Sequence, residues 1–197
     1  MRLNPYAAFD CLSIALRLQQ PRGAFAAPEV HLFAYLSCLL WLYSSNSVTD
    51  WGYDFVATEL GAPFSLDLDA ALKQLTDSGC IVRTEDRLMV GESAGRHLDD
   101  YSRLTINRDR LQCLDAACAT LSAFSLGMVT NALGSEPELS RAQELRISRR
   151  LLEETGRAQL YEQFSTLRGC LHERTSDLRL PAVVWLTALY RSQGDTE

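Results

Sequence analysis

The stretch from Val48 to Leu98 constrains the fold of this chain more than any other, because helical and extended patterns alternate within it. Apolar residues at helical spacing predict two helices, over Asp50–Leu60 and Leu66–Ser78. Gly61 and Pro63 lie between them, where glycine suits the left-handed conformation that ends a helix and proline prevents its continuation. We expect the inner face of the first helix to consist of its large apolar residues, Trp51, Phe55 and Leu60.

Two strand-like segments follow the second helix. Apolar and β-branched residues predict strands over Cys80–Thr84 and Arg87–Val90, joined by a turn at Glu85 and Asp86. Another helix is expected to begin near Ser93. Helix, turn, helix and hairpin in this order are typical of a winged helix-turn-helix, in which the second helix reads the DNA major groove and the hairpin is the wing.

Helices are predicted on both sides of this stretch. Asn4 and Pro5 are typical of a helix start, and this helix is expected to end near Leu18. A second helix, from Pro28 to about Ser44, is apolar over more than half of its circumference, so we place it at the centre of the protein. Its most apolar part, His31–Tyr43, is too short to span a bilayer.

The C-terminal half also has helical periodicity. We predict one long helix from Ile106 or Asn107 to about Leu133, and a further helix over Arg157–Glu173, after a break at Gly156. Pro181 is expected to open the last helix. The predicted fold is mainly α: a winged helix-turn-helix domain with a helical N-terminal lead-in (residues 1–104) and a C-terminal helical extension (residues 105–197).

The second helix of the central stretch has the wrong charge for reading DNA. Its exposed positions are expected to hold three carboxylates and one cation: Asp67, Asp69, Asp77 and Lys73. A helix that reads base edges needs Arg, Lys, Asn or Gln, and carboxylates repel phosphates. The net charge of −6 also disfavours a free-standing DNA-binding protein. We therefore interpret this face as one that docks a partner.

Arginines form the one basic cluster of the sequence. Arg146, Arg149 and Arg150 have the spacing of one helix face, which would suit phosphate or an acidic protein partner. Glutamates are interleaved with them, which favours a salt-bridged solvent face, and contact with phosphate or a partner stays open as the alternative. The predicted contacts to phosphate or to a partner are Arg83 and Arg87 in the wing, and Arg141, Arg146, Arg149 and Arg150 in the C-terminal half.

No catalytic or metal-binding pattern is found in the sequence. The three histidines lie on separate predicted helices, and the six cysteines form no C-x-x-C pair, which favours buried thiols in a reducing cytoplasm. Gly91–Gly95 matches G-x-S-x-G, but a wing strand precedes it instead of the parallel strand that the nucleophile elbow needs. We therefore predict neither an enzyme nor a resident cofactor or metal.

Three segments together resemble the middle component of bacterial ABC three-component systems, which include the Lamassu-type defence systems. The segments are the Asn4-Pro5-Tyr6 start, the apolar run His31–Tyr43, and Leu72–Leu75 continuing through Gly79–Val82. The resemblance implies a winged-helix accessory subunit without catalytic residues. Its implied role is to bridge an SMC-like, ABC-type ATPase and an effector such as a nuclease, in cytoplasmic defence against phage or plasmids. The resemblance implies that the chain contacts DNA only indirectly, through the complex, and that it binds no membrane.

A second function stays open at this point. A winged-helix transcription regulator would place Arg83, Arg87 and the Arg146 face on DNA phosphates. The sequence also leaves open whether the chain forms a homodimer.

Overall fold

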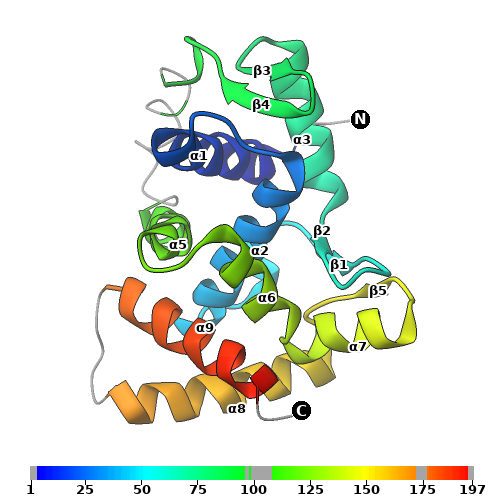
Figure 1. Ribbon diagram of the computed structural model, residues 1–197, viewed down its shortest axis with the longest axis vertical. Helices are drawn as coiled ribbons and strands as arrows, with labels where there is room; N and C mark the ends of the chain where they lie inside the picture. Colours follow the sequence, from blue (N-terminus) through cyan, green and yellow to red (C-terminus); the bar gives the residue numbers. More distant parts are fainter. Residues whose placement is uncertain (1–3, 96–97, 99–107, 172–176, 195–197) are drawn as a thin grey trace.

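The apolar helix α2 (Ala27–Tyr43) lies at the centre of the molecule, as predicted from its all-round apolar surface (Figure 1). The computed structural model describes residues 4–95, 98, 108–171 and 177–194. Helix α2 packs against α1 (Pro5–Arg22) and α5 (Arg108–Ala119), and more weakly against α8 (Glu154–Leu171). The chain is mainly helical, with short antiparallel strands.

Helix α1 begins where the sequence predicts. The Asn4 side chain accepts hydrogen bonds from the backbone N–H groups of Tyr6 and Ala7, and Pro5 is the first helical residue. The helix continues beyond Leu18 to Arg22, because Pro21 is accommodated in the last turn and Gly23, at φ 73°, provides the left-handed end.

The helix predicted over Asp50–Leu60 is wrong. A short 3-10 turn, η1 (Val48–Trp51), ends at Gly52, and the chain then runs extended into β1 (Val56–Ala57) and β2 (Pro63–Phe64). Burial alternates along this segment, with period two instead of the helical period, at Trp51, Tyr53, Phe55 and Ala57. Leu60, predicted to face inward, is 84% exposed in the turn between β1 and β2.

Helix α3 (Leu66–Asp77) and the hairpin of β3 (Ile81–Thr84) and β4 (Arg87–Val90) match the prediction closely. The hairpin packs on α1, and Phe25, between α1 and α2, forms a bridge with Leu88: the two residues exchange backbone hydrogen bonds of 3.0 and 2.7 Å. The helix predicted near Ser93 lies largely outside the described residues, as does the predicted boundary between residues 104 and 105.

The single helix predicted up to Leu133 is wrong, because the chain bends by 116° within it. Helix α5 ends at Ala119, a 3-10 turn η3 (Thr120–Ser122) follows, and α6 (Leu126–Gly134) starts in a new direction. The hydroxyls of Thr120 and Ser122 donate to backbone carbonyls of the last α5 turn, and Ser125 caps α6.

The remaining elements cover the other end of α2. Helix α7 (Pro137–Leu145) leads to β5 (Arg149–Arg150), which pairs with β1 in a sheet of order β2-β1-β5. Gly156, predicted to break a helix, is buried inside α8, and α9 (Arg179–Gly194) begins two residues before Pro181. No single described helix has the length and apolar character needed to cross a membrane.

Candidate functional site

The charged face of α3 points away from the core. Asp69, Lys73 and Asp77 are exposed and Asp67 is half-buried. The buried apolar residues of α3, whose main neighbour is α1, are Leu68, Ala71, Leu72 and Leu75. Asp67 and Asp69 lie in the first helical turn, where carboxylates also stabilise the helix dipole. Asp69, Lys73 and Asp77 follow one another at intervals of four residues and share one side of the helix, which we call the acidic face. Asp67, predicted to belong to it, lies two residues before Asp69 and points to another side.

The two hairpin arginines differ in their surroundings. Arg83 is exposed on β3. Arg87 donates from Nη2 to the Ala24 carbonyl oxygen at 2.9 Å, and its Nη1 lies 3.7 Å from the Glu29 carboxylate. Arg87 therefore helps to attach the hairpin to the connection between α1 and α2, which leaves Arg83 better placed to meet a ligand.

The C-terminal arginines do not share a helix face, so that prediction is wrong. Helix α7 ends at Leu145, and Arg146 follows in the left-handed conformation at φ 52°. Arg149 and Arg150 form β5, where successive side chains point to opposite sides. Arg150 donates to the Asp54 carboxylate at 2.7 Å, Arg149 lies close enough to Glu138 to influence its charge, and Arg141 is exposed on α7.

The two groups of arginines lie far apart. The hairpin lies at one end of the molecule, next to α3, while α7 and β5 lie towards the other end (Figure 1). The predicted residues therefore form no continuous cationic surface among the parts that the structure describes.

A cavity of about 530 Å³ brings Asp67 and Arg150 to one site. It lies between the segment after η1, the first turn of α3, and the connection from β5 to α8. Three carboxylates (Asp54, Asp67 and Glu153) and two guanidinium groups (Arg150 and Arg157) line it. The balance of both charges favours internal ion pairs, such as Arg150 with Asp54, over a strongly charged ligand.

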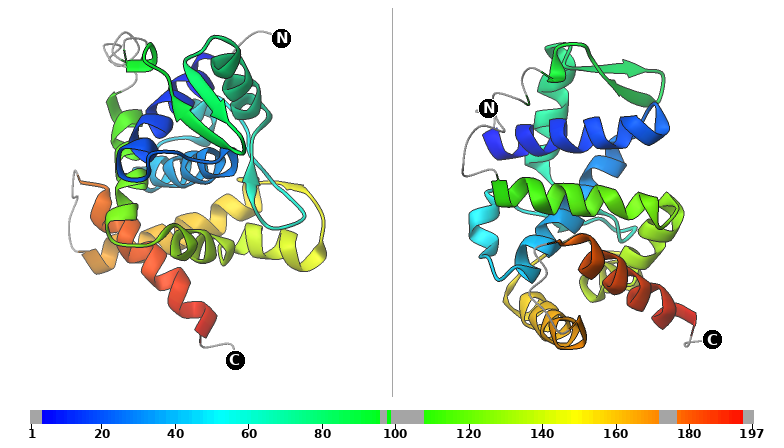
Figure 2. Two further views of the ribbon diagram at one scale, coloured as in Figure 1. Left: turned by 45° about the horizontal axis from the view of Figure 1, so that its top comes forward. Right: turned by 90° about the vertical axis from the view of Figure 1, so that its left-hand side faces the viewer.

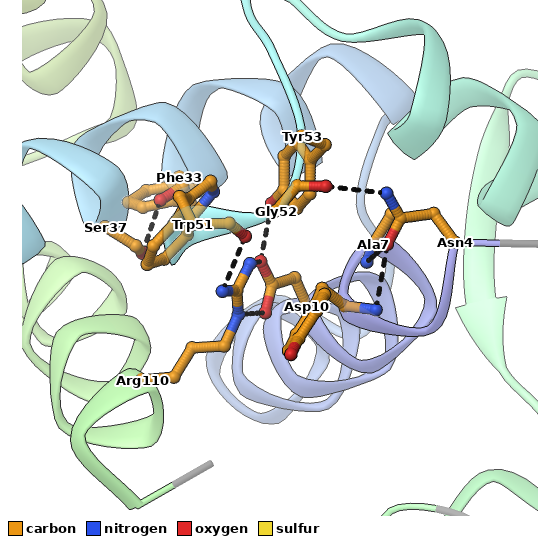
Figure 3. A network of polar contacts seen from close by, with 10 residues as sticks. Asn4, Ala7, Asp10, Phe33, Ser37, Trp51, Gly52, Tyr53 and Arg110 are labelled. Atoms are coloured by element: carbon orange, nitrogen blue, oxygen red, sulfur yellow. Dashed lines mark hydrogen bonds and ion pairs between the residues drawn. The ribbon is translucent and has the colours of Figure 1, made fainter. Parts of the chain in front are cut away.

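A buried ion pair lies beside this cavity and was not predicted from the sequence. Arg110 on α5 binds Asp10 on α1 through two hydrogen bonds of 2.6 Å. Its remaining guanidinium nitrogen, Nη1, donates to the Trp51 carbonyl oxygen at 2.8 Å (Figure 3). The Tyr53 hydroxyl donates to the same carboxylate. The guanidinium carbon lies 3.7 Å from the centre of the Trp51 ring, a cation–π contact.

This ion pair is structural. Burial raises the pKa of Asp10, and the hydrogen bonds and charge of Arg110 oppose that shift. Burial disfavours charged Arg110, but Asp10 more than compensates and raises its pKa. Both side chains are almost completely buried and use their polar atoms on each other and on the η1 segment, so the pair joins α1, α5 and η1.

Most of the described cysteines, and the described histidine His31, are buried. Burial raises the pKa of Cys113 and Cys118 to about 12, and Cys170 is the one cysteine that is exposed in the described structure. Burial lowers the pKa of His31 to about 4, and its Nδ1 accepts the Ser65 N–H at 3.2 Å. His97 and His172 lie outside the described residues, and within those residues no cluster of metal-ligating side chains is found.

A mostly apolar groove of about 650 Å³ separates α8 from α9. Leu167, Trp185 and Leu189 form its apolar floor, and Glu162 is its charged residue. We call this the α8–α9 groove. Both views of Figure 2 place α8 and α9 at the end of the molecule opposite to the hairpin and α3.

Comparison of the chain with protein-family models, with curated proteins and with solved structures gives no match.

Proposed function

We propose that this chain is a non-enzymatic accessory subunit that bridges an SMC-like, ABC-type ATPase and an effector, nuclease-like in character, in a cytoplasmic complex that acts against phage or plasmids. The observation that carries the proposal is the acidic face of α3. It presents carboxylates at the position where a DNA-reading helix carries cations, so it suits a basic protein surface better than a phosphate backbone.

The order of the N-terminal elements supports a winged-helix assignment. Helix α1, the Phe25 bridge, α2, α3 and the β3–β4 hairpin follow one another as in that fold, and Phe25, β4 and β3 lie side by side in this order. The η1–β1–β2 segment is then an insertion between the second and third helices. The hairpin is the wing of this arrangement, with its exposed apolar pair Val82 and Met89 on the outer surface.

A bridging subunit needs two separate contact surfaces. Helix α3 lies towards the end of the molecule that carries the hairpin, and α8 and α9 lie towards the other end (Figures 1 and 2). The acidic face and the α8–α9 groove differ in chemistry. The acidic face fits a basic surface of a DNA-handling ATPase, and the groove fits the apolar side of an effector helix. One chain could therefore hold both partners at the same time.

Co-purification tests this function. The tagged chain is expressed with the products of its neighbouring genes, and we expect an ATPase and an effector to elute with it in one complex. Asp69→Arg with Asp77→Arg should release the ATPase alone, because it reverses the charge of the acidic face. Ala188→Arg should release the effector alone, because it places a cation in the α8–α9 groove.

Matched controls separate these effects from general charge effects. Glu59→Arg with Glu144→Arg makes the same charge change at exposed positions outside the acidic face, and Ala158→Arg adds a cation to exposed α8 outside the groove. Both controls should keep both partners. Elution of the wild-type chain without an ATPase and without an effector would overturn the proposal.

The winged-helix layout and the exposed Arg83 favour one alternative, a transcription regulator. A regulator would shift its own promoter DNA in a gel at low salt, and the affinity would fall steeply as salt increases. Our proposal expects no shift. Salt-dependent promoter binding that Arg83→Ala weakens would favour the regulator.

A further inference from the structure

Two glutamates at the start of α7 are buried two residues apart. Glu136 is 0% exposed and Glu138 is 4% exposed. Glu136 precedes α7 and accepts the Leu139 N–H at 3.1 Å, so it caps the helix. Glu138 accepts the Leu152 N–H at 2.8 Å, which ties α7 to the connection between β5 and α8.

Each carboxylate has one oxygen without a hydrogen-bond partner. These atoms are the Oε1 atoms of Glu136 and Glu138, and both are buried. Among the described residues, neither carboxylate has an ion pair at salt-bridge distance. Two buried negative charges with two unused acceptors are costly, and a proton would supply the missing donor.

The groups around the two glutamates do not fully compensate their negative charges. The Tyr35 hydroxyl on α2 donates to Glu136 Oε2 across 3.4 Å. Arg149 on β5 acts on Glu138 from a distance, and Glu153, just before α8, opposes it with a like charge. The positive end of α7 acts on both glutamates. Arg149 therefore offsets the charge of Glu138 in part, whereas Glu136 is compensated by N–H groups and the Tyr35 hydroxyl.

The segment that Glu138 holds is under local constraint. Leu152 adopts φ 61°, a conformation that a leucine rarely takes, and its N–H is the group that Glu138 binds. One turn later, Gly156 lies so close that an added Cβ would be 2.1 Å from the Glu138 carboxyl carbon. The strained backbone at Leu152 persists because the surrounding contacts impose it.

We propose that the Glu136–Glu138 pair is a proton-dependent switch. With one proton bound, the pair holds β5 and the first turn of α8 against α7; with both carboxylates ionised, this contact weakens. The proton comes from solvent and binds a Glu136 oxygen. It removes one negative charge beside Glu138 and adds one O–H donor, while Glu138 stays ionised and keeps the Leu152 N–H.

The titration range agrees with this arrangement. Burial raises the pKa of Glu136 to about 7, the charge of Glu138 adds to the shift, and the N–H groups at the start of α7 oppose it. Burial also raises the pKa of Glu138, against the N–H of Leu152 and the charge of Arg149. The segment between Arg150 and Arg157 forms one wall of the cavity of about 530 Å³ that Asp67 and Arg150 line. The switch therefore acts on the shape of that cavity.

Hydrogen exchange measured by mass spectrometry tests the proposal. Protection is compared at about pH 6 and about pH 8, after correction for intrinsic exchange rates. From the lower to the higher pH, protection of the peptide covering residues 149–156 should fall about tenfold, the factor that corresponds to one pKa unit. Protection of α3 should stay constant. Glu136→Gln should show equal protection at both pH values, because it cannot ionise.

Glu144→Gln is the matched control, since Glu144 is exposed on the same helix and hydrogen-bonds with Ser140. It should behave like the wild type. Equal wild-type protection at both pH values would overturn the proposal, as would an undiminished loss in Glu136→Gln. Carbon NMR of the wild-type glutamate carboxyls avoids any folding defect of the variant: one resonance should titrate near pH 7, and ordinary acidic values for every glutamate would also overturn it.

Discussion

Asp10 and Glu136 are both completely buried carboxylates, yet their partners differ. Asp10 makes a bidentate ion pair with the buried guanidinium group of Arg110, which donates one hydrogen bond to each carboxylate oxygen (Figure 3). Glu136 faces a tyrosine hydroxyl, a helix N-terminus and a second glutamate, and keeps an oxygen without a partner. Burial removes each carboxylate from water, which is unfavourable, but only Asp10 has a fully charged cation beside it that compensates the loss.

This difference predicts opposite responses to the same chemical change. Removing the charge of a paired carboxylate leaves its cation buried and uncompensated, which is strongly destabilising. Removing the charge of an unpaired carboxylate relieves a desolvation cost. Replacing each carboxylate by an amide therefore tests what determines the contribution of each site to the free energy of unfolding: the charge of its partner, or burial alone.

The largest effect is expected at the paired site. Asp10→Asn should lower the free energy of unfolding by about 3–5 kcal/mol, the usual cost of breaking one side of a buried ion pair. Urea unfolding at neutral pH measures it. Arg110→Met should give a loss of similar size, because it leaves Asp10 unpaired. A loss below about 1 kcal/mol, the usual value for an exposed pair, would show that solvent reaches the site.

The unpaired site should respond in the opposite direction and with pH. The pKa of Glu136 is raised in the folded state, so its contribution is fully present below the ordinary pKa and is lost as the pH rises towards about 7. Glu136→Gln should therefore be more stable than the wild type at about pH 8, by about 2–3 kcal/mol, and the difference should shrink towards about pH 5. Urea unfolding across this range measures it.

Glu144→Gln again provides the control, because this exposed glutamate should leave the pH dependence of unfolding unchanged. If Glu136→Gln were destabilising at every pH, its cap to the Leu139 N–H would outweigh the cost of its charge. The contrast between the two sites would then be one of degree and not of sign.

Local sequence signals account for the elements that were predicted well. Asn4 with Pro5 fixes the start of α1, and the apolar spacing of α3 and the two short strands after it needs no distant partner. The segment predicted as a helix over Asp50–Leu60 has the spacing of a strand. Trp51, Tyr53, Phe55 and Ala57 alternate with residues that are less buried, which is the period of a strand.

Other features depend on contacts that no local pattern contains. The strand β5 has two residues and exists because it pairs with β1, whose residues lie 92 and 94 positions earlier in the chain than their partners. Asp10 and Arg110 are 100 residues apart, so neither stands out alone. Helical periodicity alone predicted that Asp69, Lys73 and Asp77 are exposed on α3, as they are, whereas Asp67 is half-buried in the cavity lining. The predicted arginine face is wrong because the helix that it required ends at Leu145.

The smallest effect concerns the approach of α8 to the unpaired site. Gly156→Ala places a methyl group 2.1 Å from the Glu138 carboxyl carbon, so either α8 or the carboxylate must move, at a cost of about 1–3 kcal/mol in the free energy of unfolding. Gly169→Ala is the control in the same helix, where a Cβ meets nothing within 4 Å, and a gain of up to about 1 kcal/mol is expected. Thermal or urea unfolding distinguishes the two. Because the added methyl group meets Glu138, the loss should be independent of Asp10→Asn. Additivity with Asp10→Asn, together with non-additivity with Glu138→Gln, would show that the two buried carboxylate sites act separately.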